Sequence, residues 1–424
     1  MTDILEKPQE TTTLIHDLAT KGRAAQRVLA HMDSDAKAAA LKSAAAALRA
    51  DAAAILDANA QDMAAGRDNG LTGALLDRLK LDQDRLDAIA SAVEAVAELP
   101  DPVGQEIDES QAPGGMKLVR RRIPIGLIGI IYESRPNVTA DAGALCFRSG
   151  NAALLRGGSE AVHSNRAIIK AFGRGLEEAG APADAIQLVP TQDREAVGAM
   201  LKAAGLIDMI VPRGGKGLVA RVQKDARVPV LAHLDGICHT YVHAAADPDM
   251  ARKISLNAKM RRTGICGAME TLLLDANFSA SKDVLAAIAD AGCELRGDER
   301  AQALDDRIKP ATAEDWDTEY LDAILSVKVV DGMDDALEHI AEHSSGHTDV
   351  IVTSDQAAAD RFLAEVDSAI VMHNASSQFA DGGEFGLGAE IGIATGRLHA
   401  RGPVALEGLT TYKWQVLGSG QARA

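Results

Sequence analysis

The sequence Arg-Arg-Thr-Gly-Ile-Cys-Gly-Ala-Met-Glu-Thr-Leu-Leu-Leu, residues 261–274, places one cysteine between two glycines, directly before a strand-like apolar run. Gly264 and Gly267 allow the backbone to bend and to approach a bound molecule closely. The two arginines would lower the pKa of the Cys266 thiol and favour the reactive thiolate. A free cysteine is also common as a small buried apolar residue. Whether Cys266 is a nucleophile or a buried core residue therefore depends on the other motifs of the sequence.

On both sides of this segment, short apolar strands alternate with helical segments. The run 125–131 is apolar on both faces, which is typical of a central parallel strand. The expected strands are 125–131, 152–155, 186–189 and 207–211 in a first series, and 240–242, 270–274, 323–330 and 350–352 in a second. Two such βαβ series predict an α/β protein with two doubly wound parallel-sheet domains.

Three further regions lie outside this alternation. Residues 14–65 are rich in Ala with apolar residues at helical spacing, which predicts two or three helices, and 82–98 predicts another. Residues 106–109 and 116–122 flank a Pro-Gly-Gly turn and predict a hairpin. After Asn374 the chain is glycine-rich up to Gly402.

Composition restricts the class of partner. The 424 residues carry a net charge of -17, which argues against nucleic acid and anionic membranes as partners. One cationic cluster, Lys117 with 120–122, fits a solvated strand edge or an interface better than a nucleic-acid site. No apolar run approaches the length of a membrane span.

The cysteines and the N-terminal segment indicate the compartment. Four cysteines are scattered without paired spacing, which suggests neither a disulfide framework nor a zinc site and fits a reducing compartment. Residues 1–13 are polar and lack an apolar signal core. We therefore expect a cytoplasmic protein.

The strand 125–131 leads directly into Tyr-Glu-Ser-Arg-Pro-Asn, residues 132–137. Functional side chains in doubly wound sheets lie on loops at the carboxyl ends of strands. The Asn137 amide there could donate a hydrogen bond to a developing oxyanion. Its alternative role is that of a turn residue after Pro136.

The order of this Asn137 loop, the Arg-Gly-Gly-Ser turn at 156–159 and the late cysteine resembles the aldehyde dehydrogenase superfamily. Three longer blocks, 135–141, 155–161 and 342–349, are more closely similar to its glutamyl phosphate reductase family. The resemblance covers nearly the whole chain. It implies an aldehyde-dehydrogenase-like fold with a small β arm for oligomerisation.

The resemblance also implies a domain organisation. The expected domains are a cofactor-binding domain at 1–104 with 124–230 and 376–400, a catalytic domain at 231–375, and an oligomerisation arm at 105–123 with 401–424.

The activity implied by the resemblance is the NADPH-dependent reduction of L-glutamyl 5-phosphate to L-glutamate 5-semialdehyde, with release of phosphate, in proline biosynthesis. The Cys266 thiolate would attack the acyl carbon and form a thioester. The family's oxyanion hole corresponds here to the Asn137 side chain and the Cys266 N–H. Hydrolytic relatives carry Glu-Leu-Gly-Gly where this chain has His-Leu-Asp-Gly at 233–236, so the water-activating Glu is missing. His233 is either a general acid or base or a structural residue.

For the cofactor, the resemblance assigns Arg156, Gly157 and Ser159 to the adenine ribose. A cation without an acidic partner suits a 2′-phosphate, which favours NADP(H). The turn after strand 207–211, with Gly214, Gly215 and Lys216, could approach phosphates, although its spacing is not Gly-x-Gly-x-x-Gly. Glu319 resembles the residue that holds the nicotinamide ribose.

Substrate and partner assignments follow from position in motif loops. Arg135, Arg262, Ser376 and Ser377 are the candidates for binding the substrate's charged groups. The resemblance implies a homo-oligomer built from dimers and a glutamate kinase as a candidate partner.

Two patterns are misleading on their own. His339, His343 and His347 have i, i+4 spacing, but Ser-Ser-Gly at 344–346 should break the helix, so no metal site is expected. Cys238 and His239 are adjacent on a strand and point to opposite faces, so they should not exchange a proton.

Two alternatives remain at this stage. One is an acylating aldehyde dehydrogenase that uses coenzyme A, and the other is an inactive family member retained as a binding module. The presence of both Cys266 and Asn137 argues against the second.

Overall fold

The computed structural model describes residues 3–423, so residues 1–2 and 424, the outer limits of the predicted domains, lie outside it. The chain forms two compact units. The first comprises Met1–Leu231, Gly388–Gly392 and Val404–Ala424, and the second comprises Ala232–Leu387 and Ile393–Pro403.

These units differ from the expected domains in the glycine-rich region. Residues 376–387 and 393–400, predicted to belong with the cofactor-binding residues, lie in the second unit, as do residues 401–403, predicted to belong to the arm. The cause is local hydrogen bonding, because Gln378 Nε2 donates to the carbonyl of Ala258 at 2.8 Å and to that of Arg262 at 3.2 Å. The segment is therefore tied to the cysteine-bearing part of the chain.

Five helices open the first unit. They are α1 (Asp3–Leu29), α2 (Ser34–Ala50), α3 (Ala52–Asp68), α4 (Gly73–Leu79) and α5 (Gln83–Glu98). The helices expected within 14–65 are thus three, and the first begins well before Leu14. The seven-residue α4 was not predicted, because so short a segment shows no apolar periodicity. The small residues of α2 permit close packing, since a Cβ on Gly175 would lie 2.5 Å from Ala44 Cα.

A four-stranded parallel sheet lies at the centre of the first unit, in the order β5 (Ile186–Leu188), β4 (Ala152–Arg156), β3 (Leu127–Tyr132) and β6 (Met209–Arg213). Side chains from α1, α8 (Glu195–Lys202) and α9 (Lys216–Asp225) share one buried cluster with strand residues such as Leu127 and Leu154. The helices α6 (Asn137–Arg148) and α7 (Val162–Glu178) contact strands of the same sheet.

The apolar run 125–131 does not form one strand over its whole length. Gly126 has φ +138°, and a Cβ there would overlap the Asp208 carboxylate. That carboxylate accepts hydrogen bonds from Leu127 N at 2.8 Å and Arg23 Nη1 at 2.7 Å. The chain therefore turns at Gly126, and β3 begins one residue later.

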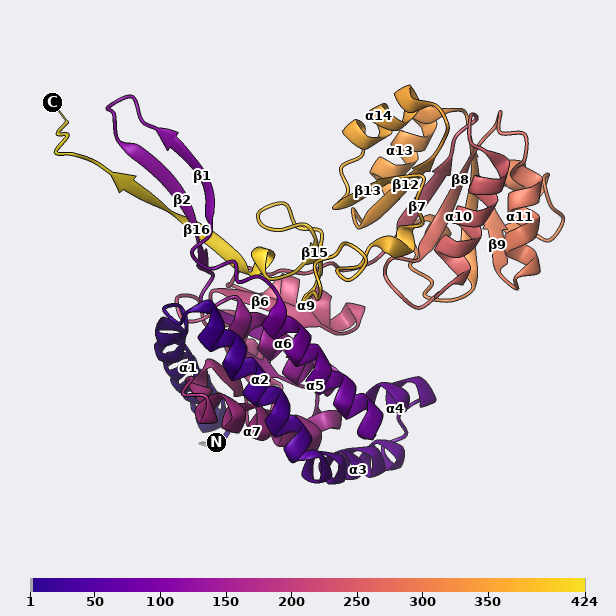
Figure 1. Cartoon of the computed structure of the whole chain (residues 1–424). Coiled ribbons are helices and arrows are strands. Elements are labelled where there is room, and N and C mark those ends of the chain that lie inside the picture. Colours follow the sequence, from indigo (N-terminus) through magenta and orange to yellow (C-terminus); the bar gives the residue numbers. More distant parts are fainter. Residues whose placement is uncertain (1–2, 424) are drawn as a thin grey trace. The chain divides into compact units, whose positions relative to one another are not determined.

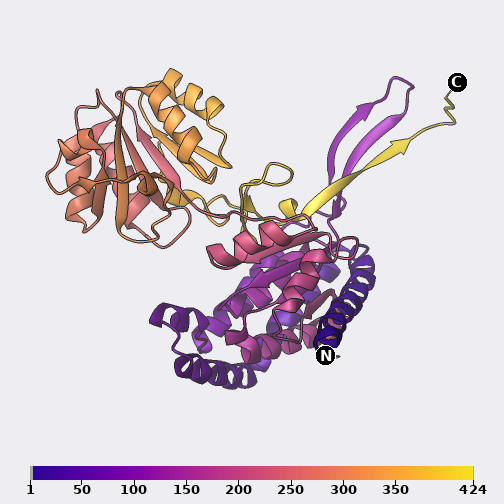
Figure 2. The same ribbon diagram turned by 180° about the vertical axis from the view of Figure 1, so that it is seen from behind.

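The predicted hairpin is β1 (Glu106–Gln111) and β2 (Lys117–Pro124), and the tail strand β16 (Thr410–Leu417) joins it as a third antiparallel strand. The three strands lie side by side in both views (Figures 1 and 2). We call this three-stranded sheet the arm.

The second unit contains a seven-stranded parallel sheet. Its order is β10 (Lys309–Pro310), β9 (Glu294–Gly297), β11 (Ile324–Val330), β8 (Met269–Asp275), β7 (Cys238–Val242), β12 (Thr348–Val352) and β13 (Ile370–His373). The four strands expected here are present, whereas β9, β10 and β13 are short and were not predicted. Both halves are thus parallel sheets of the predicted α/β class.

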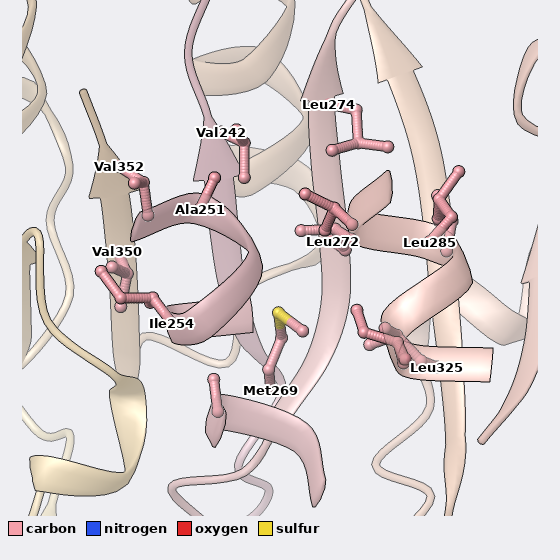
Figure 3. Packing of buried hydrophobic residues seen from close by; sticks show 14 of the residues in the cluster. Val242, Ala251, Ile254, Met269, Leu272, Leu274, Leu285, Leu325, Val350 and Val352 are labelled. Carbon is pink, nitrogen blue, oxygen red and sulfur yellow. The ribbon is translucent and has the colours of Figure 1, made fainter. Parts of the chain in front are cut away.

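Helices cover both faces of the second sheet. Ala251 and Ile254 of α10 (Pro248–Met260) and Leu285 of α11 (Ser281–Asp290) pack on one face (Figure 3). On the other, Ile340 of α13 (Met333–His343) and Phe362 of α14 (Gln356–Glu365) share a buried cluster with alternate strand residues. This two-sided covering explains the continuous apolar run at 272–274.

The remaining elements are short. They are the helix α12 (Glu299–Gln302), the strands β14 (Gly392–Ala394) and β15 (Gly402–Val404), which pair with each other, and the 3-10 turns Ser159–Ala161, Ala183–Ala185, Ala313–Asp317, Ser377–Phe379 and Glu407–Leu409. Among helices within residues 3–423, none is both long enough and apolar enough to span a membrane. All four cysteines lie in the described part of the chain and are free, as predicted.

Candidate active site

The loop that carries Cys266 joins the end of α10 to the start of β8. It packs tightly against the segment before β7, because a Cβ on Gly236 would overlap the Cys266 carbonyl oxygen and lie 2.7 Å from its Cα. On the other side, a Cβ on Gly267 would lie 3.2 Å from the Ser377 carbonyl oxygen. Only glycine at position 236 allows the two backbone segments to lie this close together. Their contact holds the half-buried Cys266 in place.

A buried ion pair flanks the same loop. Lys259 Nζ lies 2.5 Å from Glu270 Oε2, and neither side chain is exposed to solvent. The other carboxylate oxygen accepts a hydrogen bond from Leu321 N at 3.3 Å. Burial raises the pKa of Glu270 to about 7 against the opposing effect of Lys259. The pair ties the last turn of α10 to the start of β8, on either side of Cys266.

Two histidines lie beside the thiol. One ligand atom each from Cys266, His233 and His347 lies within 4.8 Å of the others. The two imidazole rings are 5.0 Å apart in a T-shaped arrangement. Burial lowers the pKa of His347 to about 3, so this ring is neutral at physiological pH.

His347 is the residue that the sequence analysis missed here. The expected break of the helix at 344–346 is confirmed, because α13 ends at His343 and His347 leaves the face that His339 and His343 share. His347 instead directly precedes β12, two strands from β8 in the sheet. Its place beside the cysteine depends on the strand order, which no local motif reveals.

A second thiol supports the backbone of the cysteine. Cys238 Sγ donates to the Cys266 carbonyl at 3.1 Å, and burial raises its pKa well above the usual value. Burial also raises the pKa of Cys146 and, to about 11, that of Cys293. These three thiols are therefore poor nucleophiles. His239 pairs with Asp349 at 3.1 Å instead of Cys238, as their adjacent positions on a strand predicted.

Glu319 also reaches this region. Its Oε1 accepts a hydrogen bond from Gly236 N at 3.0 Å, so its carboxylate lies next to the glycine that packs on Cys266. The structure thus brings Cys266, His233 and Glu319 together within the second unit. The contact of Glu319 with the nicotinamide ribose stays a prediction.

Asn137 is the first residue of α6, directly after the loop that follows β3. Its Nδ2 donates to Asp141 Oδ2, one helical turn later, at 2.8 Å. Burial raises the pKa of Asp141 to about 6. Asn137 belongs to the first unit and Cys266 to the second, and their pairing in one oxyanion hole stays a prediction.

The candidate cofactor residues lie at the carboxyl ends of neighbouring strands of the first unit. Arg156 ends β4 and is buried, and its guanidinium donates to the carbonyls of Gly157 at 2.6 Å and Gln192 at 2.9 Å. Burial lowers its pKa from the usual value. A Cβ on Gly157 would overlap the Asn165 amide. Arg156 thus shapes this turn, and Ser159 follows as an exposed residue.

The glycine turn after β6 was expected to approach phosphates, but one of its amides is already hydrogen-bonded. Gly215 caps α9, but its N–H already donates to Glu133 Oε2 at 2.9 Å. The same carboxylate oxygen would lie 2.5 Å from a Cβ on Gly214. A phosphate at this amide would have to displace Glu133. Lys216 is exposed at the first turn of the helix.

The candidate substrate residues are distributed over both units. Arg135 is half-buried in the loop after β3, and Arg262 is exposed in the cysteine loop. Ser376 and Ser377 are buried, and the Ser377 hydroxyl has no hydrogen-bond partner among the described residues. Ser376 lines a cavity of about 450 Å³ in the second unit.

This cavity adds polar residues that the sequence analysis did not select. Arg261, and not Arg262, lines it, together with Lys253, Asn257, Asn374 and Glu384. Lys253 and Asn257 lie four residues apart on α10, on one face of that helix. The cavity therefore carries cations, amides and the carboxylate of Glu384.

The chain was compared with known proteins. The family model described as "Aldehyde dehydrogenase family" matches residues 2–303. The gamma-glutamyl phosphate reductase of Novosphingobium aromaticivorans is 74% identical over 412 residues, which are 97% of this chain and 97% of that protein.

Solved structures agree on the fold. The crystal structure of gamma-glutamyl phosphate reductase from Thermotoga maritima is 42% identical, with a TM-score of 0.95 over 97% of this chain and 100% of that chain. An acetylating aldehyde dehydrogenase from Geobacillus thermoglucosidasius shares the fold, with a TM-score of 0.70 at 18% identity over 100% of both chains.

Proposed function

Because the chain belongs to the aldehyde dehydrogenase family, we propose that it reduces L-glutamyl 5-phosphate to L-glutamate 5-semialdehyde with NADPH and releases inorganic phosphate. The observation that carries this proposal is Cys266, held by Gly236 and flanked by two histidines. The relatives named for this activity cover nearly the full length of the chain.

The first step is nucleophilic attack. The Cys266 thiolate attacks the acyl carbon of the acyl phosphate, a C–S bond forms, the C–O bond to phosphate breaks, and phosphate leaves. The Asn137 amide and the Cys266 N–H would donate to the oxyanion of the tetrahedral intermediate. The remaining three thiols have raised pKa values, which favours Cys266 for this role.

The second step returns the thiolate. The Cys266 thioester would accept at its carbon the hydride that a bound nicotinamide cofactor would supply. The C–S bond then breaks, the aldehyde is released and the Cys266 thiolate is restored. His233 stands where hydrolytic relatives carry Glu, and its Nδ1–H donates to the carbonyl of Ile393 at 2.9 Å. The carboxylate that activates water in hydrolytic relatives is therefore absent at this position, which favours hydride transfer over hydrolysis of the thioester.

The residues at the strand ends of the first unit fit a phosphorylated dinucleotide. Ser159 is exposed and offers a hydroxyl where a carboxylate would repel a 2′-phosphate. Lys216 is exposed and offers a cation. The neighbouring Glu160 carboxylate is engaged by Ser134, whose Oγ donates to it at 2.7 Å. These residues, with Arg156, Gly157, Gly214 and Gly215, would hold NADPH in preference to NADH.

The test is the reverse reaction. We expect glutamate 5-semialdehyde to reduce NADP⁺ only when phosphate is present, and we expect Cys266→Ala to abolish this activity. The matched control is Cys293→Ala, which removes a buried thiol of the same unit. Turnover without phosphate would indicate a hydrolytic enzyme, turnover with coenzyme A in place of phosphate would indicate an acylating one, and activity in Cys266→Ala would contradict the proposal.

We also propose that the arm joins two copies of the chain. The strand β16 is an edge of the arm and exposes Tyr412, Trp414 and Val416. Arg120 packs over the rings of Tyr412 and Trp414 at 5.2 and 5.6 Å. Exposed aromatic residues on an unpaired edge strand are suited to association.

Light scattering tests this association. Trp414→Ser should weaken the oligomer, whereas Leu398→Ser, at a fully exposed position in the second unit, should leave it unchanged. An unchanged oligomer in Trp414→Ser would contradict the role of β16. A glutamate kinase would supply the labile substrate, and adding one to the assay tests direct transfer.

A further inference from the structure

The cluster formed by Cys266, His233 and His347 has a property that the proposed reaction does not use. Each residue offers one ligand atom, and these atoms lie within 4.8 Å of one another. Within the described residues 3–423, this is the one group of three or more His, Cys, Asp or Glu side chains arranged closely enough to hold a metal ion. Sulfur and imidazole nitrogen are the ligands that Zn²⁺ prefers.

The hydrogen bonds of His233 identify its ligand atom. Its Nδ1 lies 2.9 Å from the carbonyl oxygen of Ile393, which can only accept, so the proton is on Nδ1. The Nε2 of the neutral ring then carries a lone pair. Metal-binding histidines are typically oriented by such a bond from the opposite ring nitrogen to a backbone carbonyl.

His347 is held through its Nδ1 as well, in this case by side chains. Its Nδ1 lies 2.9 Å from Thr348 Oγ1 and 3.6 Å from Cys238 Sγ. The side chain is fully buried. Its Nε2 has no hydrogen-bond partner among the described residues. A buried nitrogen without a partner costs free energy, which a bound cation would recover.

We propose that Cys266, His233 and His347 form a binding site for Zn²⁺, with the Cys266 thiolate and the two Nε2 atoms as ligands and water in the fourth position. Binding replaces the thiol proton: the S–H bond breaks, the Zn–S bond forms and one proton is released to solvent. No electron is transferred. Tetrahedral zinc places sulfur and nitrogen ligands about 3.6 Å apart, so a small rotation of the side chains closes the site.

A metal on this thiol has a direct consequence. The sulfur lone pair that bonds to zinc is the one needed to attack an acyl carbon, so Zn²⁺ would inhibit the enzyme reversibly and shield Cys266 from alkylation. The inhibition rests on the proposed function, whereas the binding does not.

The experiment uses Co²⁺ as a spectroscopic substitute for Zn²⁺ in the full-length protein without substrate. We expect one Co²⁺ per chain, a sulfur-to-cobalt charge-transfer band and displacement of Co²⁺ by Zn²⁺. Cys266→Ala should abolish the band, and His347→Ala should weaken binding by about tenfold or more. The matched controls Cys293→Ala and His243→Gln, which lie in the same unit outside the cluster, should bind as the wild type does.

A second measurement uses the wild-type protein and so does not depend on the folding of a variant. Mass spectrometry of wild-type protein treated with iodoacetamide should show that Zn²⁺ slows the labelling of Cys266, and a chelator should restore it. His233→Ala replaces His347→Ala if circular dichroism shows that the latter is unfolded. The proposal is wrong if the wild type shows no charge-transfer band, or if Cys266→Ala retains it.

The two proposals fail in different ways. Metal binding with no phosphate-dependent turnover would overturn the proposed function and leave the zinc site. Full turnover with no Co²⁺ band would overturn the zinc site and leave the function.

Discussion

The cofactor and oxyanion candidates of the first sheet and the cysteine cluster of the second sheet lie at opposite ends of their strands. In the first unit, Asn137 follows β3, Ser159 follows β4 and Lys216 follows β6. In the second unit, Cys266 precedes β8 and His347 precedes β12. The usual rule that ligands bind at the carboxyl ends of parallel strands therefore locates the candidate residues of the first unit but not Cys266.

The two groups also differ in burial. Ser159, in the turn after β4, and Lys216, in the first turn of α9, are exposed, whereas His347 is fully buried and Cys266 is half-buried. The cysteine is held by Gly236 and by the ion pair of Lys259 and Glu270. We therefore expect substitutions around the cysteine to affect stability and geometry, and those at the carboxyl ends of the first sheet to affect mainly ligand choice.

The largest effect is expected from Lys259→Met. This change leaves Glu270 buried without its partner, and removing one member of a buried ion pair costs about 3–5 kcal/mol. The free energy of unfolding by urea should fall by that amount. Because the unfolding of two units is not two-state, the transition should be followed by a probe in the second unit, such as Trp316.

Two controls sharpen this prediction. The double variant Lys259→Met/Glu270→Met should recover much of the stability, because no charge stays buried. Lys309→Met breaks an exposed ion pair with Glu294 of the same unit, with 63% of the lysine side chain exposed, and should cost less than about 1 kcal/mol. Equal losses for Lys259→Met and Lys309→Met would refute the structural role of the buried pair.

The second largest effect is expected from Gly236→Ala. Its Cβ would overlap the Cys266 backbone, and the displaced thiol should lower kcat by about a hundredfold, since a shift of about 1 Å has that effect on a reacting group. The measurement is kcat in the phosphate-dependent assay. Gly264→Ala, in the loop that carries Cys266, adds a Cβ with its nearest contact at 3.8 Å and should retain most of the activity. Comparable kcat values for the two variants would show that the Gly236 contact does not position the thiol.

The sequence predicts the first unit's site better than the second's. Each candidate of the first unit directly follows an apolar strand, so a local pattern is enough to place Asn137 or Ser159 at a strand end. Glu133 could not be foreseen at the glycine turn, because its contact with Gly215 depends on the pairing of β3 with β6.

The second unit shows why the rest could not be predicted. Cys266, Gly236 and His347 come from three separate segments, and they meet because β8, β7 and β12 are neighbours in the sheet. Strand order is a non-local property that the composition of each strand does not encode. The class of the fold, set by alternating strands and helices, was predictable, whereas the short strands β9, β10 and β13 were not.

A titration of Asp141 tests how firmly the first unit holds Asn137, the proposed oxyanion residue. Burial raises the pKa of Asp141 to about 6, above the usual value of about 4, so the folded state keeps a proton that the unfolded state releases. Stability should therefore be lost as the pH rises from about 4 to about 6, by about 2 kcal/mol after allowance for solvent screening.

The measurement is the free energy of unfolding across that pH range. Asp141→Asn should remove the slope, and Asp57→Asn, at an exposed position on α3, should keep it. Asp141→Leu, which does remove the acceptor of the Asn137 amide, should lower kcat more than it raises KM. If the free energy of unfolding of Asp141→Asn still falls with pH, another titrating group is responsible.

The smallest effect is expected from Ser159→Asp, which tests whether the carboxyl ends of the first sheet govern ligand choice alone. A carboxylate at this exposed position would repel a ribose 2′-phosphate and accept a hydrogen bond from a 2′-hydroxyl. The kcat/KM for NADP⁺ should fall by about tenfold, which corresponds to about 1.4 kcal/mol, whereas that for NAD⁺ should not fall. Ser110→Asp adds the same charge on the exposed strand β1 and should leave the ratio unchanged. Thermal unfolding should not differ among the three proteins, because neither serine is buried. A loss of stability in Ser159→Asp would mean that this loop is as dependent on packing as the loop of Cys266, and the contrast between the two sheets would then fail.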